Sequence, residues 1–242
     1  LGEGVAEFTY TPVVSSSRPQ NYAIVGYPLG MMKANVRQTN DAGEFLIDDD
    51  GFYIETTEPE LVGDPNPDWT AGITNSISWN GLSLDFTWQY RHGGDMFSQD
   101  AATLVGRGVL NPGTVREGLY VLDGVNKNTG QTNTTQITAI NYGFDIFSFG
   151  PGELQIFDAT TIRLSEVNLS YDFPRNLLER TPFGSLTATL TGINLFYDAV
   201  NVPDVVNFDS NVLSTGVGNA MGLSFITGPS SRRVGLTLKA TF

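Results

Sequence analysis

Strict alternation of apolar and polar side chains around a two-residue turn is the feature of this sequence that most constrains its fold. Between Trp69 and Trp79 the large apolar residues occupy odd positions, and between Leu82 and Arg91 they occupy even positions. Successive side chains of a β-strand point to opposite faces, so each run has one apolar and one polar face. Asn80-Gly81 joins the runs, and both central residues of a type I′ hairpin turn need positive φ. Each arm has about 11 residues, which is enough for a tilted crossing of a bilayer.

The last thirteen residues, Ser230–Phe242, carry the same alternation up to a terminal aromatic residue. The apolar phase holds Val234, Leu236, Leu238, Ala240 and Phe242. The opposite phase holds Thr237, Lys239 and Thr241. This pattern suits a wall with lipid on one side and a wet lumen on the other, although the closing strand of a soluble sandwich has the same period.

Two further long strands are predicted at Thr160–Phe173 and Ser185–Tyr197. The first breaks phase, because Ile162 and Leu164 have the opposite parity from the apolar residues that follow them. A β-bulge near Ser165-Glu166 would restore the phase. The other explanation is that the first part of this strand stands above the membrane among different neighbours.

Weaker alternation marks Met31–Gln38 and Val5–Val14 as additional strands. The chain is thus predicted to be all-β and to supply about six or seven strands of an antiparallel transmembrane β-barrel wall. In the long strands the charged residues share one phase, which assigns the two faces. The residues predicted to face lipid are Trp69, Ile73, Ile77, Leu84, Phe86, Trp88, Leu186, Leu190, Leu236 and Leu238. Those predicted to face the interior are Asp85, Arg91, Thr187, Thr189 and Lys239.

The connections between the predicted strands alternate between long and short. The long ones are Thr39–Asp68, His92–Ala159 and Asp198–Pro229, and the short ones are Asn80-Gly81 and Pro174–Gly184. Outer-membrane barrels combine short periplasmic turns with long extracellular loops. We therefore predict that the three long loops are extracellular and that the chain ends at the periplasmic rim.

Composition excludes several classes of function. A formal net charge of -13 argues against nucleic acid, whose phosphates would be repelled. The chain has no cysteine, which removes thiol catalysis and thiolate metal sites, and its single histidine, His92, excludes a multi-histidine metal site. We identify no catalytic residues, no cofactor site and no particular substrate-binding residues.

Two features are candidates for specific roles. Asp48, Asp49 and Asp50 followed by Gly51 form a weak candidate for a hard-cation site, because calcium prefers several oxygen ligands. The full spacing of a calcium loop is missing, so a solvated turn is the favoured interpretation. Gly93-Gly94, after His92, is predicted to permit a tight bend.

Several segments taken together resemble a known family of membrane proteins. They are Gly26-Tyr-Pro-Leu-Gly30, the acidic hairpin Phe45–Ile54, Gly63-Asp-Pro-Asn-Pro-Asp-Trp69, Arg91-His-Gly-Gly-Asp95, Arg163–Tyr171 and Gly192-Ile-Asn-Leu-Phe196. In this order and spacing, and followed by a terminal aromatic strand, they resemble the carboxy-terminal part of the SusC/RagA family of TonB-dependent outer-membrane transporters. The resemblance covers nearly the whole chain.

The resemblance implies that residues 1–242 are the carboxy-terminal part of a TonB-dependent receptor β-barrel of about 22 strands, with the plug domain not in this chain. It implies nutrient uptake across the bacterial outer membrane, chiefly oligosaccharide import, without enzymatic chemistry. The implied partners are a SusD-like surface lipoprotein, the TonB complex through a region absent here, outer-membrane lipid, and a glycan or peptide substrate. It also implies that Phe242 is an assembly signal, and the alternative role is an interfacial aromatic anchor.

Other functions fit parts of the pattern. A soluble β-sandwich carbohydrate-binding module would stay dispersed without detergent. A TonB-dependent transporter for peptides or metal chelates would share the same wall. A glycosidase on a β scaffold needs two carboxylates about 5–9.5 Å apart, and no such pair is evident in the sequence.

Overall fold

The structure is a computed structural model, and it describes residues 4–9, 18–110, 116–203, 206, 209, 220–225, 228 and 230–242. The chain divides into two compact units. Unit 1 comprises Leu1–Pro67, Gly93–Ala159 and Asn201–Gly228. Unit 2 comprises Asp68–His92, Thr160–Val200 and Pro229–Phe242. The long connections 93–159 and 201–228 between strands of unit 2 therefore belong to unit 1.

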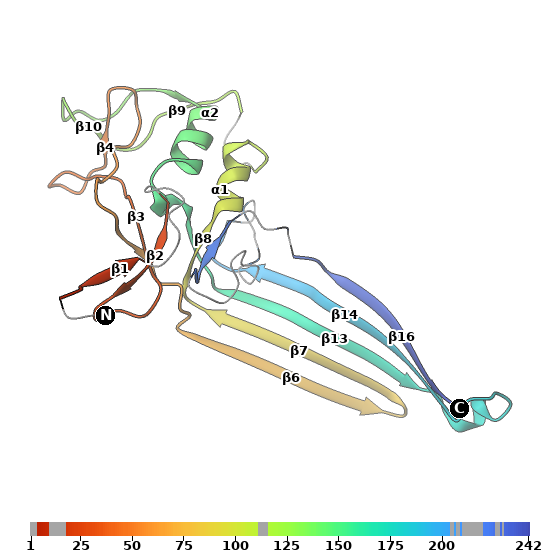
Figure 1. Cartoon of the computed structure of the whole chain (residues 1–242). Helices are drawn as coiled ribbons and strands as arrows, with labels where there is room; N and C mark the ends of the chain where they lie inside the picture. Colours follow the sequence, from red (N-terminus) through yellow and green to blue (C-terminus); the bar gives the residue numbers. More distant parts are fainter. Residues whose placement is uncertain are drawn as a thin grey trace. The chain divides into compact units, whose positions relative to one another are not determined.

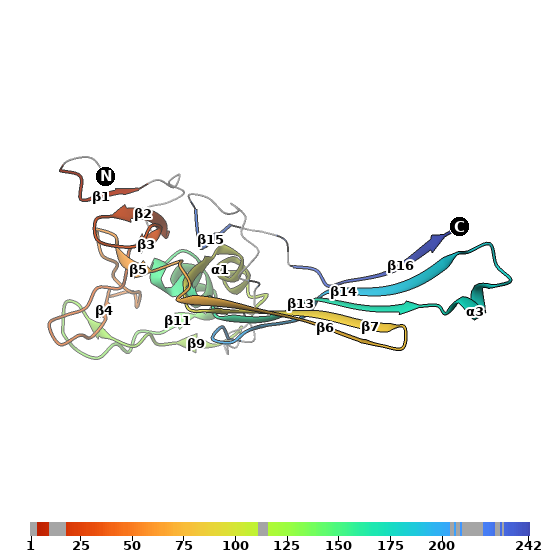
Figure 2. The ribbon, with the colours of Figure 1, turned by 90° about the horizontal axis from the view of Figure 1, so that it is seen from below.

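Unit 2 is a five-stranded antiparallel sheet in which neighbours in the sequence are neighbours in space (Figure 1). Its strands are β6 (Trp69–Trp79), β7 (Leu82–His92), β13 (Thr161–Asp172), β14 (Ser185–Ala199) and β16 (Arg233–Thr241). These bounds agree closely with the five long segments predicted from alternation. Figure 2 shows the same strands turned by 90°, without a second sheet of unit 2 over either face.

The β6–β7 hairpin has the predicted turn. Its register is unbroken from Trp69 opposite His92 to Trp79 opposite Leu82. Asn80 and Gly81 take φ values of 48° and 83°, the left-handed conformations that a type I′ turn requires.

A β-bulge resolves the phase break in β13. The register against both β7 and β14 shifts between Leu164 and Glu166. Leu164 pairs with Trp88 and Val167 pairs with Phe86, so Ser165 is the extra residue. Of the two explanations for the phase break, the bulge is confirmed.

All short connections of unit 2 leave the sheet at one end. The Asp172 backbone N–H donates to the Gly81 carbonyl at 2.8 Å, which brings the end of β13 beside the β6–β7 turn. The β13–β14 connection holds a short helix, α3 (Arg175–Leu178). The chain terminus lies there too, because Gly184 N–H donates to the Thr241 carbonyl at 2.6 Å. The long connections leave the sheet at the opposite end.

The described residues of unit 1 form four small sheets. A four-stranded sheet has the order β1 (Glu7–Thr9), β2 (Gln20–Ile24), β3 (Met31–Ala34) and β5 (Glu60–Gly63). A three-stranded sheet has the order β12 (Ile156–Asp158), β8 (Asp95–Ser98) and β15 (Leu223–Ser224). Two-stranded pairs join β10 (Val125–Asn126) with β4 (Leu46–Ile47), and β11 (Ile137–Thr138) with β9 (Leu119–Tyr120).

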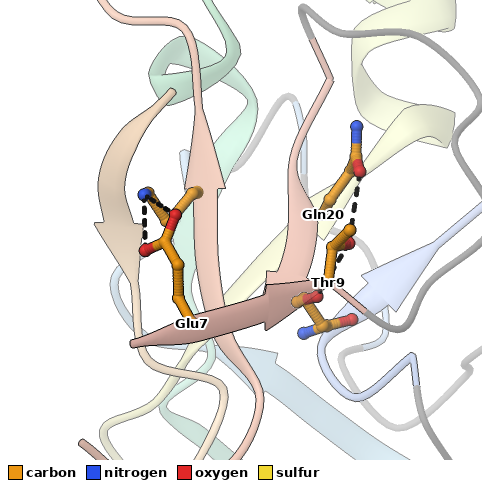
Figure 3. Close-up of polar contacts among 5 residues, drawn as sticks. Glu7, Thr9 and Gln20 are labelled. Atoms are coloured by element: carbon orange, nitrogen blue, oxygen red, sulfur yellow. Dashed lines mark hydrogen bonds and ion pairs between the residues drawn. The ribbon is translucent and has the colours of Figure 1, made fainter. Parts of the chain in front are cut away.

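Side chains tie the first strands of the four-stranded sheet together (Figure 3). Thr9 Oγ1 donates to Gln20 Oε1 at 3.4 Å, and both carboxylate oxygens of Glu7 accept from Lys33 Nζ at 2.9 Å. Residues 10–14 of the strand predicted at Val5–Val14 lie outside the described residues.

The expectation of six or seven strands in one wall is corrected here, because the sheet of unit 2 has five. The segments predicted near Val5 and Met31 contribute β1 and β3 to unit 1. β3 has only four residues, and Met31, Met32 and Ala34 are all buried. It is too short to cross a bilayer, and both of its faces are covered.

The buried cores belong to unit 1. One gathers Met32, Phe97, Ala220 and Leu223, and the other gathers Ile47, Leu122, Ile137 and Ile146. Connection 93–159 also contains helical segments that the all-β expectation missed, namely α1 (Gln99–Gly106), α2 (Ala139–Asn141), the π-helical η1 (Tyr142–Ser148) and the 3-10 segment η2 (Gly152–Gln155). Among the described residues, no helix combines the length and apolar character needed to cross a membrane.

Candidate functional site

The two faces of the unit 2 sheet differ completely in chemistry. One apolar row crosses all five strands, from Ile77 through Leu84, Leu169 and Leu190 to Leu236. These side chains are not packed away, since Ile77 is 55% exposed and Leu236 is 69% exposed. The register confirms that the ten residues predicted to face lipid share this face and that the five predicted to face the interior share the other. We call these surfaces the apolar face and the polar face.

Aromatic side chains gather at both ends of the apolar face. At the end where the long connections leave, the Trp69 ring lies 5.0 Å from Tyr90 and 5.5 Å from His92. At the end with the short connections, the Phe183 ring lies 5.3 Å from Phe242, and Tyr171 lies 5.1 Å from Phe173. Aliphatic residues occupy most of the face between the two clusters.

Hydroxyl groups line the polar face and bond across the strands. Each pair joins residues that are opposite in the register, which fixes neighbouring strands against each other. The pairs are Thr74 with Thr87 at 3.1 Å, Ser78 with Ser83 at 2.9 Å, Ser170 with Thr189 at 2.9 Å, Thr191 with Asn168 at 2.7 Å, and Thr187 with Asp172 at 2.6 Å.

The bulge in β13 lies next to Arg163, which is on the polar face. Arg163 Nη1 donates to Asn194 Oδ1 at 3.0 Å, and its guanidinium lies 4.9 Å from the Tyr197 ring centroid. Asn194 has φ of 53°, an unusual conformation for a residue other than glycine. Ser165 Oγ donates to the Thr87 carbonyl at 3.0 Å and so anchors the bulge to β7.

The acidic hairpin Phe45–Ile54 in unit 1 forms as predicted. Asp48 closes its turn, because Asp48 Oδ1 accepts from the backbone N–H groups of Asp50 at 3.0 Å and Phe52 at 2.8 Å. The Asp49 carboxylate accepts from the side-chain amides of Asn126 and Asn128, each at 2.9 Å. These bonds lower the pKa of Asp49, with Asn126 the larger cause.

These contacts weaken the case for a cation at Asp48, Asp49 and Asp50. Two of the three carboxylates already accept hydrogen bonds from amide donors, which a metal ion would have to displace. Within the described part of the chain, no group of three or more histidine, aspartate or glutamate side chains is arranged to hold a metal ion. The sequence did not point to Asn126 and Asn128, which lie 77 and 79 residues from Asp49.

A second group of carboxylates surrounds Asp95 in unit 1. Asp95 Oδ2 accepts from the Asp64 backbone N–H at 2.9 Å, and Asp95 lies opposite Asp158 in the pairing of β8 with β12. Burial raises the pKa of Asp95, and the charges of Asp158 and Asp64 add to this effect, while the bond from Asp64 opposes it. Burial likewise raises the pKa of Glu55.

His92 is placed by a glycine bend, as predicted. Gly93 and Gly94 take φ values of 70° and 81°, which favour glycine. His92 Nε2 lies 3.8 Å from Asp68 Oδ2, and its ring stacks on Tyr90 at 6.3 Å. Phe242 is 90% exposed, and its role in assembly stays a prediction.

Comparison with known proteins connects this architecture to TonB-dependent receptors. TonB-dependent receptor P26 from Formosa agariphila is 27% identical over 194 residues, and TonB-dependent receptor P3 from the same organism is 24% identical over 212 residues. These alignments cover 78% and 83% of this chain, but only 18% and 19% of the relatives. The chain thus spans less than a fifth of the length of these curated relatives. No family model matches the chain.

The fold has counterparts among solved structures. The RagAB peptide importer in its closed-closed state matches with a TM-score of 0.58 at 17% identity, over 100% of this chain and 25% of that chain. Its open-open state matches with a TM-score of 0.58 at 16% identity. Together with the curated relatives, these matches support the resemblance to SusC/RagA-type TonB-dependent transporters.

Proposed function

We propose that this chain forms part of the wall and the extracellular loops of a TonB-dependent transporter in the bacterial outer membrane. The observation that carries this proposal is the single-layer sheet of unit 2, with an uncovered apolar face bounded by aromatic clusters and a hydroxyl-lined polar face behind it. Exposing such a face to water would be costly, whereas lipid solvates it.

The dimensions support lipid on the apolar face. From Trp69 to Trp79 the strand rises roughly 33 Å at about 3.3 Å per residue. A tilt of about 35–45° reduces this to roughly 25 Å, which matches the apolar band of outer-membrane barrels. The aromatic clusters then lie at the two headgroup levels.

The polar face is proposed to line the interior of a barrel of about 22 strands, completed by strands outside this chain and containing a plug domain. Open sheet edges are not tolerated in lipid, so β6 and β16 require further strand partners. Unit 1, formed largely by the long connections, is proposed to be extracellular and to contact a SusD-like surface lipoprotein. That partner, and TonB as the energy source, rest on the family resemblance.

The proposed activity is uptake of a large nutrient without covalent chemistry. Oligosaccharide is the cargo that the SusC/RagA resemblance favours, while the solved RagAB structures are described as those of a peptide importer. Peptide is therefore the second candidate cargo.

Uptake by intact cells tests the proposal. Cells with and without the protein would receive fluorescent oligosaccharides and peptides, each in backgrounds with functional and inactivated TonB. We expect accumulation of one class that requires both the protein and TonB. Accumulation that is independent of TonB would contradict the proposed mechanism.

Fractionation separates this function from the soluble sandwich. A barrel wall should sediment with outer membranes, require detergent for extraction and show heat-modifiable electrophoretic mobility. A carbohydrate-binding module would remain dispersed without detergent, and that result would overturn the proposal.

A further inference from the structure

A pocket of about 350 Å³ lies in unit 1 between α1 and the helical segment Ala139–Ser148. Two glycines let these helices approach closely. A Cβ on Gly106 would lie 2.7 Å from Ser148 Cβ, and one on Gly143 would lie 3.0 Å from the Val105 carbonyl oxygen. The helices thus pack closely at these two glycines, and both glycines line the pocket.

Two arginines, Arg107 and Arg116, line this pocket. Arg116 Nη2 donates to the Gly108 carbonyl at 2.8 Å, which holds one arginine against the loop that follows the other. Arg107 lies with its guanidinium 5.8 Å from the Phe144 ring centroid. Both contacts orient the side chains and leave their charges unneutralised.

Neither arginine has an acidic partner among the described residues. The ion pairs there involve Lys33, Arg37 and His92, and no carboxylate oxygen lies within 4.0 Å of either pocket arginine. The chain has 26 acidic and 13 basic residues, so acidic partners are abundant. Both arginines are exposed, and two cations that line one pocket without a carboxylate partner favour an anion there.

The remaining walls are largely apolar. Val105 is buried, whereas Ile140, which also lines the pocket, is 75% exposed. Tyr142 also lines the pocket, and its ring lies 5.1 Å from the Tyr120 ring. A ligand that fits both parts of the lining carries an acidic group next to a ring or an aliphatic body.

We propose that this pocket binds a carboxylate-bearing ligand, with Arg107 and Arg116 contacting the carboxylate and Ile140 and Tyr142 contacting the adjacent ring or side chain. A planar guanidinium matches a carboxylate through two parallel N–H···O bonds. The carboxylate could be the free end of a peptide or the acid group of a uronate sugar. Binding of a carboxylate at this pocket does not depend on the proposed function. A role for the pocket in contacting imported cargo rests on that function.

Calorimetric titration of the detergent-purified protein tests the site. One probe pair is the dipeptide Gly-Phe with a free carboxylate and its carboxy-terminal amide, and the other is glucuronate and glucose. We expect an acid to bind and its neutral counterpart to bind at least about tenfold more weakly, because the lost bonds are charge-assisted. The pair that binds identifies the source of the carboxylate.

Variants locate the site. Arg116→Gln and Arg107→Gln should each weaken binding of the acid by about tenfold or more, and Arg116→Lys should weaken it less because it keeps the charge. Arg180→Gln removes the same charge from an exposed position in the β13–β14 connection and should leave affinity unchanged. Heat-modifiable mobility of each variant reports whether it is folded.

Three results would overturn the proposal: no binding of either acid, equal binding of acid and neutral probes, or full affinity in the folded R107Q/R116Q variant. Uptake assays separate this inference from the proposed function. TonB-dependent uptake that the two substitutions leave intact would remove the pocket from the cargo path. Carboxylate binding without TonB-dependent uptake of any solute would overturn the proposed function and leave the site in place.

Discussion

Leu164 and Val167 lie on the same face of β13 although they are three positions apart. They pair with Trp88 and Phe86, which are two positions apart on β7, because Ser165 is accommodated as a bulge. The bulge keeps both halves of the apolar face in phase and leaves Arg163 on the polar face, opposite Gln89.

Deleting Ser165 should therefore disrupt the sheet far more than truncating its side chain. Without the extra residue, one half of β13 must reverse its faces, which would carry either Arg163 or Glu166 to the apolar face. We expect a severe loss of folded protein in the outer membrane, measured by heat-modifiable mobility. Ser165→Ala removes only the bond to the Thr87 carbonyl, about 1 kcal/mol. Equal yields of the two variants would contradict the role of the bulge.

Arginine at Phe86 should destabilise the protein by about 2–4 kcal/mol if that position lies near mid-membrane. Phe86 lies on the apolar face and its neighbour Thr87 on the polar face, where Thr87→Arg should cost much less. Urea unfolding of the protein in lipid vesicles measures both variants. Equal tolerance at the two positions would show that the apolar face does not meet lipid.

An epitope inserted after Asn128 should be accessible to antibody on intact cells. Asn128 lies in an exposed turn of connection 93–159, which we propose to be extracellular. The same epitope after Arg180, in the short β13–β14 connection, should be labelled only after the outer membrane is permeabilised. The opposite labelling would reverse the proposed topology.

Asp95→Asn should raise the thermal midpoint at pH 7. Burial raises the pKa of Asp95 above the ordinary 3.8, so the folded state favours the protonated carboxyl. The stabilisation that Asp95 gives the folded state, through its raised pKa, is fully present below pH 3.8. It is lost as the pH rises through the pKa of Asp95 in the folded state. Asparagine keeps an oxygen to accept the Asp64 N–H without carrying charge.

The increase in thermal midpoint caused by Asp95→Asn should therefore become smaller as the pH falls toward 3.8. Asp50→Asn is the matched control, because Asp50 is exposed on the hairpin turn. This substitution should change the thermal midpoint little at either pH. A gain for Asp95→Asn that is independent of pH would point to packing instead of charge.

Deleting Phe242 should lower the amount of protein inserted and leave uptake per inserted molecule unchanged. Among the described residues Phe242 makes one ring contact, with Phe183, so its loss should cost at most a few kcal/mol. Surface abundance and uptake would be measured on the same cells. Normal abundance with reduced uptake per molecule would assign Phe242 to transport and remove its role in assembly.

The predictable parts of this fold are those whose signal is local. Alternation with a period of two residues identified the long strands, because successive side chains of a strand point to opposite faces in any sheet. Asn80-Gly81 identified the turn, because both residues accept positive φ. The weak alternation of Met31–Gln38 did predict a strand, but it did not show that β3 belongs to unit 1 and is buried on both faces.

The candidate sites also divide into those with a local sequence signal and those without one. The faces of the sheet were predicted residue by residue, whereas the amides that bind Asp49 and the arginine pocket beside α1 were not. These sites bring together residues from distant positions, and nothing in the local pattern around Asp49 specifies Asn126. The acidic run did predict a hairpin turn, because Asp48 caps it through bonds to residues two and four positions away.

The hydroxyl pairs of the polar face have a consequence for anything that moves along it. A hydroxyl both donates and accepts, so a passing solute can replace a cross-strand partner without leaving either group unsatisfied. At these pairs each exchange replaces one hydrogen bond with a similar one, so none of the hydroxyl pairs would hold a solute strongly. A polar chain could then move along these hydroxyl pairs without being held at any one of them. Selectivity among solutes would have to come from other residues, such as those of the loops.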